Sequence, residues 1–432
     1  MNLKPSKNFD TSKFNLPDDQ LEVRYGLPSE IKFCSICNIS NQQPMSSNEY
    51  EHNKESTKVT MSFNEQGICH ACQFHKIRES VEVNWDAREQ ELIELCDQFR
   101  KHDGSYDCIV GGSGGKDSAM QSHLLKYKYK MNPLTVTWSP HLYTDIGWKN
   151  FQDWLHIGGF DNYLFTPNGK IHRLLTRNAT KNLLHPFQPF ILGQKTFVAK
   201  MAAKFNIPLI FYGEMPGEYG EQISHNTSGF GSDKDNLESE GYSLDYLGKN
   251  DIRDVFLGGK AIGQYLQEGV SMADLQSYLP ADPNLLSEKS ISFRYLGYYK
   301  KWVPQDAYYY AVENTGFEAN PVRTEGTYSK YNSLDDKTDG FFYFTRWIKF
   351  GVGRAMMDSS QEIRNHHIDK DEAIALMQRY EGEYPARYEK EFLEYINMTQ
   401  EEFLGLCDEF RSPHLWKIED GHWMLRKTPW TA

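Results

Sequence analysis

The sequence predicts an α/β protein in which a parallel sheet carries helices on both of its faces. Short apolar segments that are typical of buried strands alternate with segments of helical period between residues 86 and 214. One of these strands, at residues 108–110, is followed directly by a glycine-rich turn and a helical segment. Two pairs of cysteines precede this region and aromatic-rich helical segments follow it. We therefore expect an N-terminal module that is similar to a zinc ribbon, and a mostly helical C-terminal region.

Length and charge limit the class of protein. The chain has 432 residues, which is enough for about two to three domains. Its net charge of −12 disfavours binding along a nucleic-acid backbone. The sequence has no run of roughly 18 apolar residues, as a membrane-spanning helix would need, and no apolar secretory signal at its N-terminus. We expect a cytoplasmic protein that neither inserts into a membrane nor binds nucleic acid.

We divide the chain into three regions. Residues 1–80 form an extended arm and the cysteine-containing module, and residues 81–284 form the α/β domain. Within that domain, residues 217–250 are rich in Gly, Ser and Asp, which predicts a long polar loop. Residues 285–432 form the helical, aromatic-rich C-terminal region.

The expected elements follow one another in the order of an α/β domain. Asp86 begins a helix, and Glu89 three residues later completes a capping-box pattern. Another helix begins at about Lys195 and leads into a fully apolar strand. We expect strands at residues 108–110, 134–138, 162–166 and 208–212, and helices at residues 86–99, 119–130, 145–159 and 195–205.

Four of the seven cysteines form two CxxC pairs near the N-terminus, Cys34 with Cys37 and Cys69 with Cys72. Thiolates at this spacing converge on one ion, and two such pairs give a closed tetrahedral site of four sulfur atoms. The role of such a site is structural, because no position is left for water. The spacer between the pairs is longer than in a compact zinc finger, so a loop must bulge between them. We expect structural Zn²⁺, with an iron–sulfur cluster or free thiols as the alternatives.

The strongest functional signal is the segment SGGKDS at residues 113–118, which lies directly after a strand and opens a helix. Glycines allow backbone N–H groups to turn toward an anion, and the N-terminus of the helix adds partial positive charge. Lys116 adds a full positive charge, Asp117 is suited to hold Mg²⁺, and Ser118 can donate to a phosphate oxygen. The segment predicts a phosphate-binding loop, with a glycine-rich turn that binds no ligand as the alternative.

Two commoner phosphate-binding motifs do not fit this segment. A Walker A loop that placed its lysine at Lys116 would need Gly at position 110 and Ser or Thr at position 117, where the sequence has Val110 and Asp117. A GxGxxG motif that began at Gly112 would also need Gly at position 117. The segment therefore matches neither of these two motifs.

SGGKDS resembles the PP-loop of the ATP pyrophosphatase superfamily, which implies a HUP-like sheet and cleavage of ATP between its α and β phosphates. Several stretches together resemble the N-acetyl sugar amidotransferases of surface-polysaccharide and flagellin-sugar biosynthesis. Those enzymes are similar to the ones that make acetamidino sugars of LPS O-antigens and of the pseudaminic and legionaminic type. The matching stretches are FCSICNISNQQP, GICHACQFH, GGSGGKDS, DIGWKNFQDW, GGFDNYLFTPNGKIHRLLTRN, NLLHPFQPFILGQK and PLIFYGEMPGEYG. The resemblance is weaker after about residue 220, where FGVGRAMMDSSQEIRN carries it.

The resemblance implies that an amide is converted into an amidine. The acetamido carbonyl oxygen of a nucleotide-linked N-acetyl sugar attacks the α-phosphate of ATP, pyrophosphate leaves, and ammonia then displaces AMP. Adenylation is needed because an amide carbonyl is a poor electrophile. In such a reaction the protein mainly positions the reactants and neutralises phosphate charge.

The resemblance also implies roles for individual residues. Lys116, Asp117, Lys195 and Glu214 are the expected catalytic residues: Lys116 and Lys195 neutralise phosphate charge, Asp117 holds Mg²⁺, and Glu214 lies at the edge of the sheet where ligands bind. The expected ATP-binding residues are Ser113, Gly114, Gly115, Lys116, Asp117, Ser118, Trp138 and Asp145.

Other interpretations stay open for part of this set. Trp138 could instead be a core tryptophan and Lys195 a solvated helix lysine. Asp145 and Asn150 could contact nucleotide or ribose, with local capping as the alternative. For four aromatic residues of the C-terminal region, stacking on a sugar or base is possible but core packing is favoured; these are Tyr295, Tyr298, Tyr299 and Trp302. Two arginines are candidates for binding a diphosphate or a uronate, namely Arg323 and Arg354.

We expect ammonia to come from a separate glutaminase subunit, delivered through a cyclase-like barrel subunit as the resemblance suggests. A glutaminase of the N-terminal-nucleophile type needs a first mature cysteine, and position 2 is Asn. A triad glutaminase needs a cysteine on a strand–helix turn. The three cysteines outside the CxxC pairs do not fit that pattern, since Cys96 and Cys407 lie in helical segments and Cys108 precedes the loop.

Two other functions compete with this one. A tRNA-modifying PP-loop enzyme of the thiolase type shares the adenylation step and often carries CxxC pairs, but it needs a basic face for RNA, which the net charge of −12 disfavours. A zinc-ribbon scaffold whose nucleotide loop only regulates assembly is disfavoured by the intact SGGKDS segment.

Overall fold

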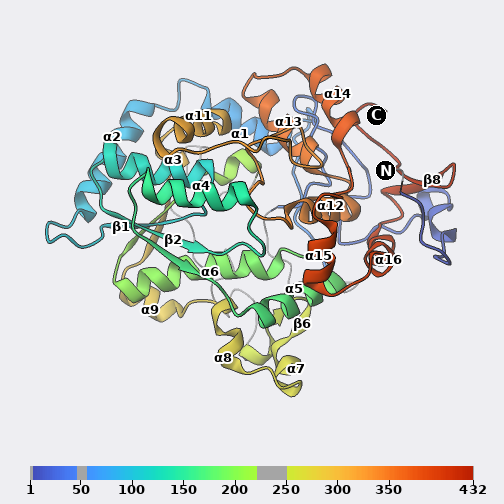
Figure 1. Ribbon diagram of the computed structural model, residues 1–432. Coiled ribbons are helices and arrows are strands. Elements are labelled where there is room, and N and C mark those ends of the chain that lie inside the picture. The colour runs from blue at the N-terminus through green and yellow to red at the C-terminus, as the bar shows by residue number, and fades with distance from the viewer. Residues whose placement is uncertain (1–2, 46–55, 221–250, 432) are drawn as a thin grey trace.

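A computed structural model describes residues 3–45, 56–220 and 251–431 of the chain. Its centre is a five-stranded sheet in the order β3-β2-β1-β4-β7, and each pair of neighbouring strands is parallel (Figure 1). The strands are β1 (Cys108–Gly111), β2 (Pro133–Trp138), β3 (Asn162–Phe165), β4 (Leu209–Tyr212) and β7 (Ser292–Tyr295). The predicted α/β class is confirmed, and four of these strands lie where the apolar segments predict them.

Strand β7 was not expected from the sequence. It pairs with β4 from Leu209 opposite Ser292 to Tyr212 opposite Tyr295. The boundary expected at residue 284 therefore falls before the last strand of the sheet. The segment around this strand mixes aromatic residues with Arg294, so it shows neither the apolar run nor the alternation that identifies a strand.

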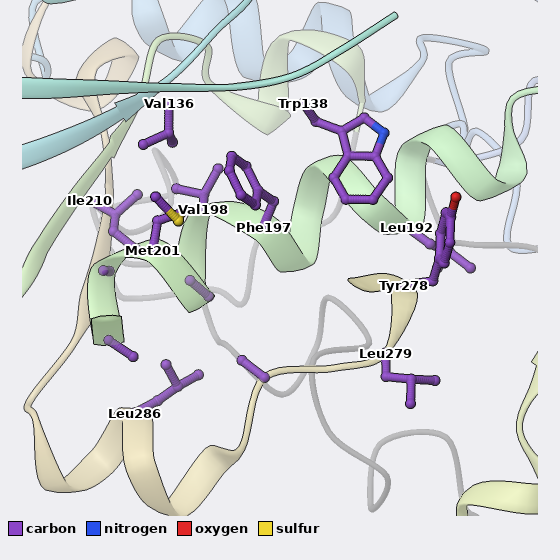
Figure 2. Close-up of a cluster of buried hydrophobic side chains, with 14 of the residues drawn as sticks. Val136, Trp138, Leu192, Phe197, Val198, Met201, Ile210, Tyr278, Leu279 and Leu286 are labelled. Atoms are coloured by element: carbon purple, nitrogen blue, oxygen red, sulfur yellow. The ribbon is translucent and has the colours of Figure 1, made fainter. Parts of the chain in front are cut away.

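One face of the sheet is covered by α6 (Gln188–Phe205) and by the segments that follow β4. Ile109 of β1 and Ile210 of β4 point to this face, where they belong to one buried cluster with side chains of α6. Figure 2 shows Ile210 beside Val198 and Met201 of that helix. Figure 2 shows Phe197 and Val198 of α6 between the strands and Leu286, which lies farther from the sheet. Each such fully buried side chain contributes about 1.5–3 kcal/mol.

The other face packs against α2 (Trp85–Phe99), α3 (Lys116–His123) and α10 (Leu296–Tyr299). Val110 and Phe211 alternate with the isoleucines of the first face and lie in a second buried cluster with Leu92 of α2. Both faces of the sheet are therefore covered, as predicted for parallel strands.

Three predicted helix starts are wrong, and one of them is that of α3, which begins at Lys116 and not at residue 119. Helix α2 begins one residue before Asp86, because the Asn84 side chain accepts the N–H of Ala87 and caps the helix. Glu89 is not part of a capping box; its carboxylate pairs instead with lysines of neighbouring segments. Helix α6 begins at Gln188, well before Lys195, because Pro189 is well suited to the first turn of a helix.

The C-terminal region is mostly helical, as predicted, and ends in a two-stranded antiparallel hairpin of β8 (Trp416–Glu419) and β9 (His422–Leu425). The N-terminal segment packs against this region rather than against the sheet (Figure 1). The backbone N–H of Trp423 donates to the carbonyl oxygen of Leu3, and Phe14 is buried beside Trp423. The first and last parts of the chain thus share one core.

The remaining elements surround this framework. A π-helical turn at Leu124–Lys128 extends α3, and a 3-10 turn follows β4 at Pro216–Tyr219. Most of the predicted polar loop, residues 221–250, lies outside the described residues. No helix of the described part is long and apolar enough to cross a bilayer. The other helices and strands are α1 (His70–Arg78), α4 (Asp145–His156), α5 (Gly169–Leu183), β5 (Phe256–Leu257), β6 (Lys260–Ala261), α7 (Ile262–Gln267), α8 (Met272–Leu275), α9 (Pro283–Glu288), α11 (Pro304–Thr315), α12 (Asp339–Phe350), α13 (Arg354–Arg364), α14 (Lys370–Tyr380), α15 (Glu389–Ile396) and α16 (Gln400–Phe410).

Candidate active site

A cavity of about 600 Å³ opens at the carboxyl ends of the central strands, where open parallel sheets bind their ligands. The ends of β1, β2 and β4 contribute Gly111, Trp138 and Tyr212 to its wall. The opposite wall comes from residues 331–335, α12 and α13. The sheet and the C-terminal region therefore enclose the cavity together, and its volume is typical of small-molecule sites.

The glycine-rich loop at this cavity takes its shape from Gly114. This residue has a φ of +83°, and a Cβ atom there would lie 2.7 Å from the Cα atom of Phe151. Both the backbone conformation and the space exclude a side chain at this position. The next residue, Gly115, is the N-cap of α3, so the uncapped N–H groups of the first helical turn lie beside the cavity. The loop is built as an anion site would require.

Lys116 and Asp117 form an ion pair in the wall of the cavity. The Nζ atom of Lys116 lies 2.6 Å from Oδ2 of Asp117, and the lysine is 8% exposed. The indole Nε1–H of Trp302 donates to the other oxygen, Oδ1, at 2.9 Å. Each oxygen of the Asp117 carboxylate therefore has a fixed partner, and the carboxylate is held beside the loop.

We expect the substitution Trp302→Phe to raise the Mg²⁺ concentration that gives half-maximal ATP cleavage by about tenfold. The ring stays in the wall, but the N–H group that orients Asp117 is lost, and a hydrogen bond to a charged group contributes about 1.5–3 kcal/mol. Pyrophosphate release titrated with Mg²⁺ measures the effect. Trp148→Phe, at an exposed position of α4, is the matched control. An unchanged Mg²⁺ requirement in the Trp302 variant would contradict this role.

The structure places most of the predicted site residues around the cavity. Lys195 reaches it from the middle of α6 rather than from the start of a helix, and Glu214 reaches it from the turn after β4. The predicted residues that line the cavity are Ser113, Gly114, Gly115, Lys116, Asp117, Ser118, Trp138, Asn150, Lys195, Glu214, Tyr295, Trp302 and Arg354. Their binding and catalytic roles stay predictions.

Four predicted residues do not reach the cavity. Asp145 is exposed in the first turn of α4, where its charge favours the N-terminus of that helix, and Thr144 is the cap. Arg323 is held by both carboxylate oxygens of Glu383, at 2.6 and 2.7 Å. Two tyrosines, Tyr298 and Tyr299, pack in the buried cluster on the face of the sheet that α2 covers.

Trp138 is packed in the core and also lies at the cavity, so each of its two predicted roles agrees in part with its position. It is 4% exposed and belongs to the cluster in Figure 2, and its ring lies so close to Gly193 that a Cβ atom there would come within 2.2 Å of it. Trp138 also lines the cavity, and its Nε1–H has no hydrogen-bond partner among the described residues. The packing role is observed, and contact with adenine stays a prediction.

Sequence reasoning missed Asp335, which approaches the loop from the C-terminal region. Ser113 hydrogen-bonds to its carboxylate, and burial raises the pKa of Asp335 above its ordinary value. The residue reaches this place because α4 has a glycine, Gly147, where a Cβ atom would lie 2.4 Å from the Cα atom of Asp335. In the sequence, the acidic segment LDDKTD at residues 334–339 was the only local indication of a functional carboxylate here.

The four cysteines of the CxxC pairs converge as predicted. All are buried, and their sulfur atoms lie within 4.8 Å of one another. Backbone N–H groups donate to two of the sulfur atoms, for example from Cys69 to Cys34 Sγ at 3.3 Å. Such donors stabilise thiolates, so the donor set fits one tetrahedrally coordinated metal ion.

A buried charged network joins this cysteine centre to the cavity. Arg364 of α13 reaches the sulfur of Cys37 at 3.6 Å and also donates to the carbonyl oxygen of Glu218 at 2.9 Å. The Glu218 carboxylate pairs with Arg78 at 2.6 Å, and both side chains are 2% exposed. Arg78 in turn donates to the carbonyl oxygen of Trp302 at 3.0 Å. The cysteine module is therefore packed directly behind the cavity wall.

Comparison with known proteins finds a similarity in the C-terminal region. Residues 325–429 match the model of the C-terminal domain of WbpG-like LPS biosynthesis proteins. This match confirms the expected relationship to proteins of surface-polysaccharide biosynthesis for that region. An uncharacterized protein from Methanocaldococcus jannaschii is 35% identical over 80 residues, which is 18% of this chain and 28% of that protein.

Three solved structures are similar in part. The NH3-dependent NAD synthetase from Campylobacter jejuni is 16% identical, with 48% of this chain and 92% of that chain covered and a TM-score of 0.27. The NMN synthetase from Francisella tularensis is 12% identical, with 66% and 94% covered and a TM-score of 0.27. The tRNA thiolase NcsA from Methanococcus maripaludis, with its 4Fe–4S cluster, is 12% identical, with 72% and 87% covered and a TM-score of 0.29. Scores this low carry no argument about activity.

Proposed function

We propose that this chain is an ATP-dependent, AMP-forming amidotransferase that acts on a nucleotide-linked N-acetyl sugar. The carbonyl oxygen of the acetamido group attacks the α-phosphate of ATP and pyrophosphate leaves. Ammonia then adds to the activated carbon, and AMP leaves with the former amide oxygen. The product is an acetamidino sugar for a surface polysaccharide or a flagellin glycan. One observation carries the proposal: the SGGKDS loop opens into a cavity whose other wall lies in the region that matches the WbpG-like domain.

The residues at the loop suit this reaction. The N–H groups at the start of α3 and the ammonium group of Lys116 would neutralise charge on the phosphates. Asp117 would hold Mg²⁺, which shields phosphate charge when bound. Lys195 would approach the phosphates from α6, while Glu214 is suited to receive a proton from the incoming ammonia at the end of β4.

We also propose that the ammonia is made by a separate glutaminase subunit. A cysteine nucleophile must be accessible and must ionise easily. The three cysteines outside the CxxC pairs are all buried. Burial raises the pKa of Cys96 to about 12 and that of Cys407 to about 12, and it also raises the pKa of Cys108. These properties support a source of ammonia outside this chain, for which the cyclase-like barrel partner is a further expectation.

For the cysteine centre we propose a single structural Zn²⁺ ion. Zinc–sulfur bonds of about 2.3 Å in a tetrahedron place the sulfur atoms about 3.8 Å apart. The distance between the sulfur atoms is 3.9 Å for Cys34 and Cys72 and 3.6 Å for Cys37 and Cys69. In a four-iron cluster each thiolate binds a different iron atom, so the sulfur atoms lie farther apart. The distances therefore support one ion over a cluster.

The products of ATP cleavage test the proposed function. Purified protein is incubated with ATP, Mg²⁺, ammonium and UDP- or CMP-linked acetamido sugars, and nucleotides and sugars are analysed by mass spectrometry. We expect AMP, pyrophosphate and a sugar in which NH has replaced one oxygen. Formation of ADP would overturn the proposal. Glutamine in place of ammonium should give no product with this chain alone, and AMP formation that required tRNA would favour the thiolase alternative.

A further inference from the structure

Helix α13 lies between the cysteine module and the cavity and contacts both of them, and Met357 and Arg364 touch both. Met356 and Ile363 on one face pack in a buried cluster with the cysteines, and the Ser360 hydroxyl donates to the carbonyl oxygen of Cys37 at 2.8 Å. The opposite face lines the cavity. Its residues follow the three- and four-residue spacing of one side of a helix; they are Arg354, Met357, Asp358, Gln361 and Arg364.

The positive charges of this face already have partners in the protein. The Nε atom of Arg354 lies 2.9 Å from Oδ1 of Asp358, one turn along the helix. Arg364 is engaged by the Glu218 carbonyl oxygen and the Cys37 sulfur. A phosphate group at this wall would have to compete with both sets of contacts and would also approach the carboxylate of Asp358. A dianionic group is better matched by the loop across the cavity, where Lys116 is also paired but the backbone N–H groups at the start of α3 are uncapped.

The same face is well suited to hydroxyl and amide groups. The Nε2 atom of Gln361 is buried and has no hydrogen-bond partner among the described residues, although such donors are normally satisfied. Tyr343 brings its ring and hydroxyl to the same wall, and Ser333 lies beside it with its hydroxyl 3.2 Å from the Tyr343 hydroxyl. Met357 adds an apolar surface. Alternating polar groups and apolar surface match the edges and the face of a sugar ring.

We infer that the cavity face of α13 binds the uncharged glycosyl ring of the acceptor, with its hydroxyl and acetamido groups, and not its phosphate-containing carrier. This inference rests on the proposed function, because it places the acceptor opposite the ATP loop. Gln361 donates to an acceptor oxygen. Asp358 is given no contact with the sugar, because its Oδ1 atom is paired with Arg354 and its Oδ2 atom accepts from the Thr327 hydroxyl at 2.6 Å. The cysteine module has a defined part in this arrangement, since it supports the helix from behind.

Binding of two probes to the full-length protein tests the inference. N-acetyl-D-glucosamine carries the proposed ring without a phosphate, and UDP is a carrier without a sugar. Both are titrated by NMR in the presence of Mg²⁺ and α,β-methylene-ATP. In Gln361→Ala we expect the affinity for N-acetyl-D-glucosamine to fall about three- to tenfold, as for one lost hydrogen bond, and the affinity for UDP to stay unchanged. Gln378→Ala, at an exposed position of the neighbouring helix α14, should change neither affinity.

Three outcomes would overturn the inference: no saturable binding of N-acetyl-D-glucosamine to the unmodified protein, an unchanged affinity in Gln361→Ala, or an equal loss of affinity for UDP. Gln361→Met keeps the volume of the side chain and replaces Gln361→Ala if that variant unfolds, with the same expected result. The proposed function is tested separately by the products of ATP cleavage. Sugar binding at α13 without AMP formation would refute the proposed function and leave the binding site. AMP formation with unaltered sugar binding in the variants would refute the binding site and leave the proposed function.

Discussion

Replacing Lys116 by alanine is expected to lower AMP formation at least about a hundredfold while the fold stays intact. The ammonium group lies at the start of α3 beside the phosphate-binding loop, and removing one preorganised group that neutralises charge in a transition state costs about 10²–10³ in rate. Because Trp302 still holds one oxygen of Asp117, the carboxylate keeps its orientation in the variant. The expected loss therefore reports on phosphate charge and not on a displaced Asp117.

The measurement is the initial rate of pyrophosphate release, together with the thermal unfolding of each protein. Lys170→Ala is the matched control, because Lys170 is an exposed lysine in the first turn of another helix, α5. The control should keep the rate of the unmodified protein. A Lys116 variant that unfolds at the same temperature and retains most of its activity would remove the main support for the ATP site.

Loss of the proposed Zn²⁺ from the cysteine centre is expected to have the second large effect. A structural zinc site contributes an apparent binding free energy of about 10–16 kcal/mol, and this free energy is available to folding because the unfolded chain has no preformed site. In Cys72→Ser we expect the bound metal to be lost and the free energy of unfolding to fall by more than about 4 kcal/mol. The measurements are metal content by elemental analysis and unfolding followed by circular dichroism.

The same variant should lose affinity for ligands of the cavity, because α13 rests on the cysteine module. Cys96→Ser is the matched control: Cys96 is fully buried in the cluster on one face of the sheet, away from the metal-binding set. It should keep the metal and lose only stability. A metal-free protein with unchanged unfolding would contradict a structural role for the centre.

The sequence was sufficient for those parts of the fold that have a local signal. Strands β1 to β4 are apolar runs between turns, and the glycine-rich turn between β1 and α3 is a contiguous motif, so both could be predicted. The convergence of the two CxxC pairs followed from their spacing alone. Strand β7 and the start of α6 have weak local signals. At β7 the buried Arg294 interrupts the apolar pattern, and at the start of α6 Pro189 lies within an apolar segment.

The rest of the candidate site depends on contacts between distant parts of the chain. Trp302 is 185 residues from the carboxylate that it orients, and Asp335 reaches the loop only because α4 has no side chain at Gly147. On the polar side of α13, only Arg354 was a candidate from the sequence. A stripe of Arg, Asp and Gln on a helix normally indicates a solvated surface, and only the position of the helix shows that this stripe faces a cavity.

The position of α13 has a consequence for how parts of this protein could be exchanged with those of a related one. The cysteine module, the sheet and the C-terminal helices are far apart along the chain, yet they build one cavity wall in layers. An exchange of substrate preference between two related proteins would therefore require α13 to be transplanted together with the cysteine module that supports it. If the C-terminal segment were grafted alone, α13 would pack against a cysteine module whose side chains do not match it.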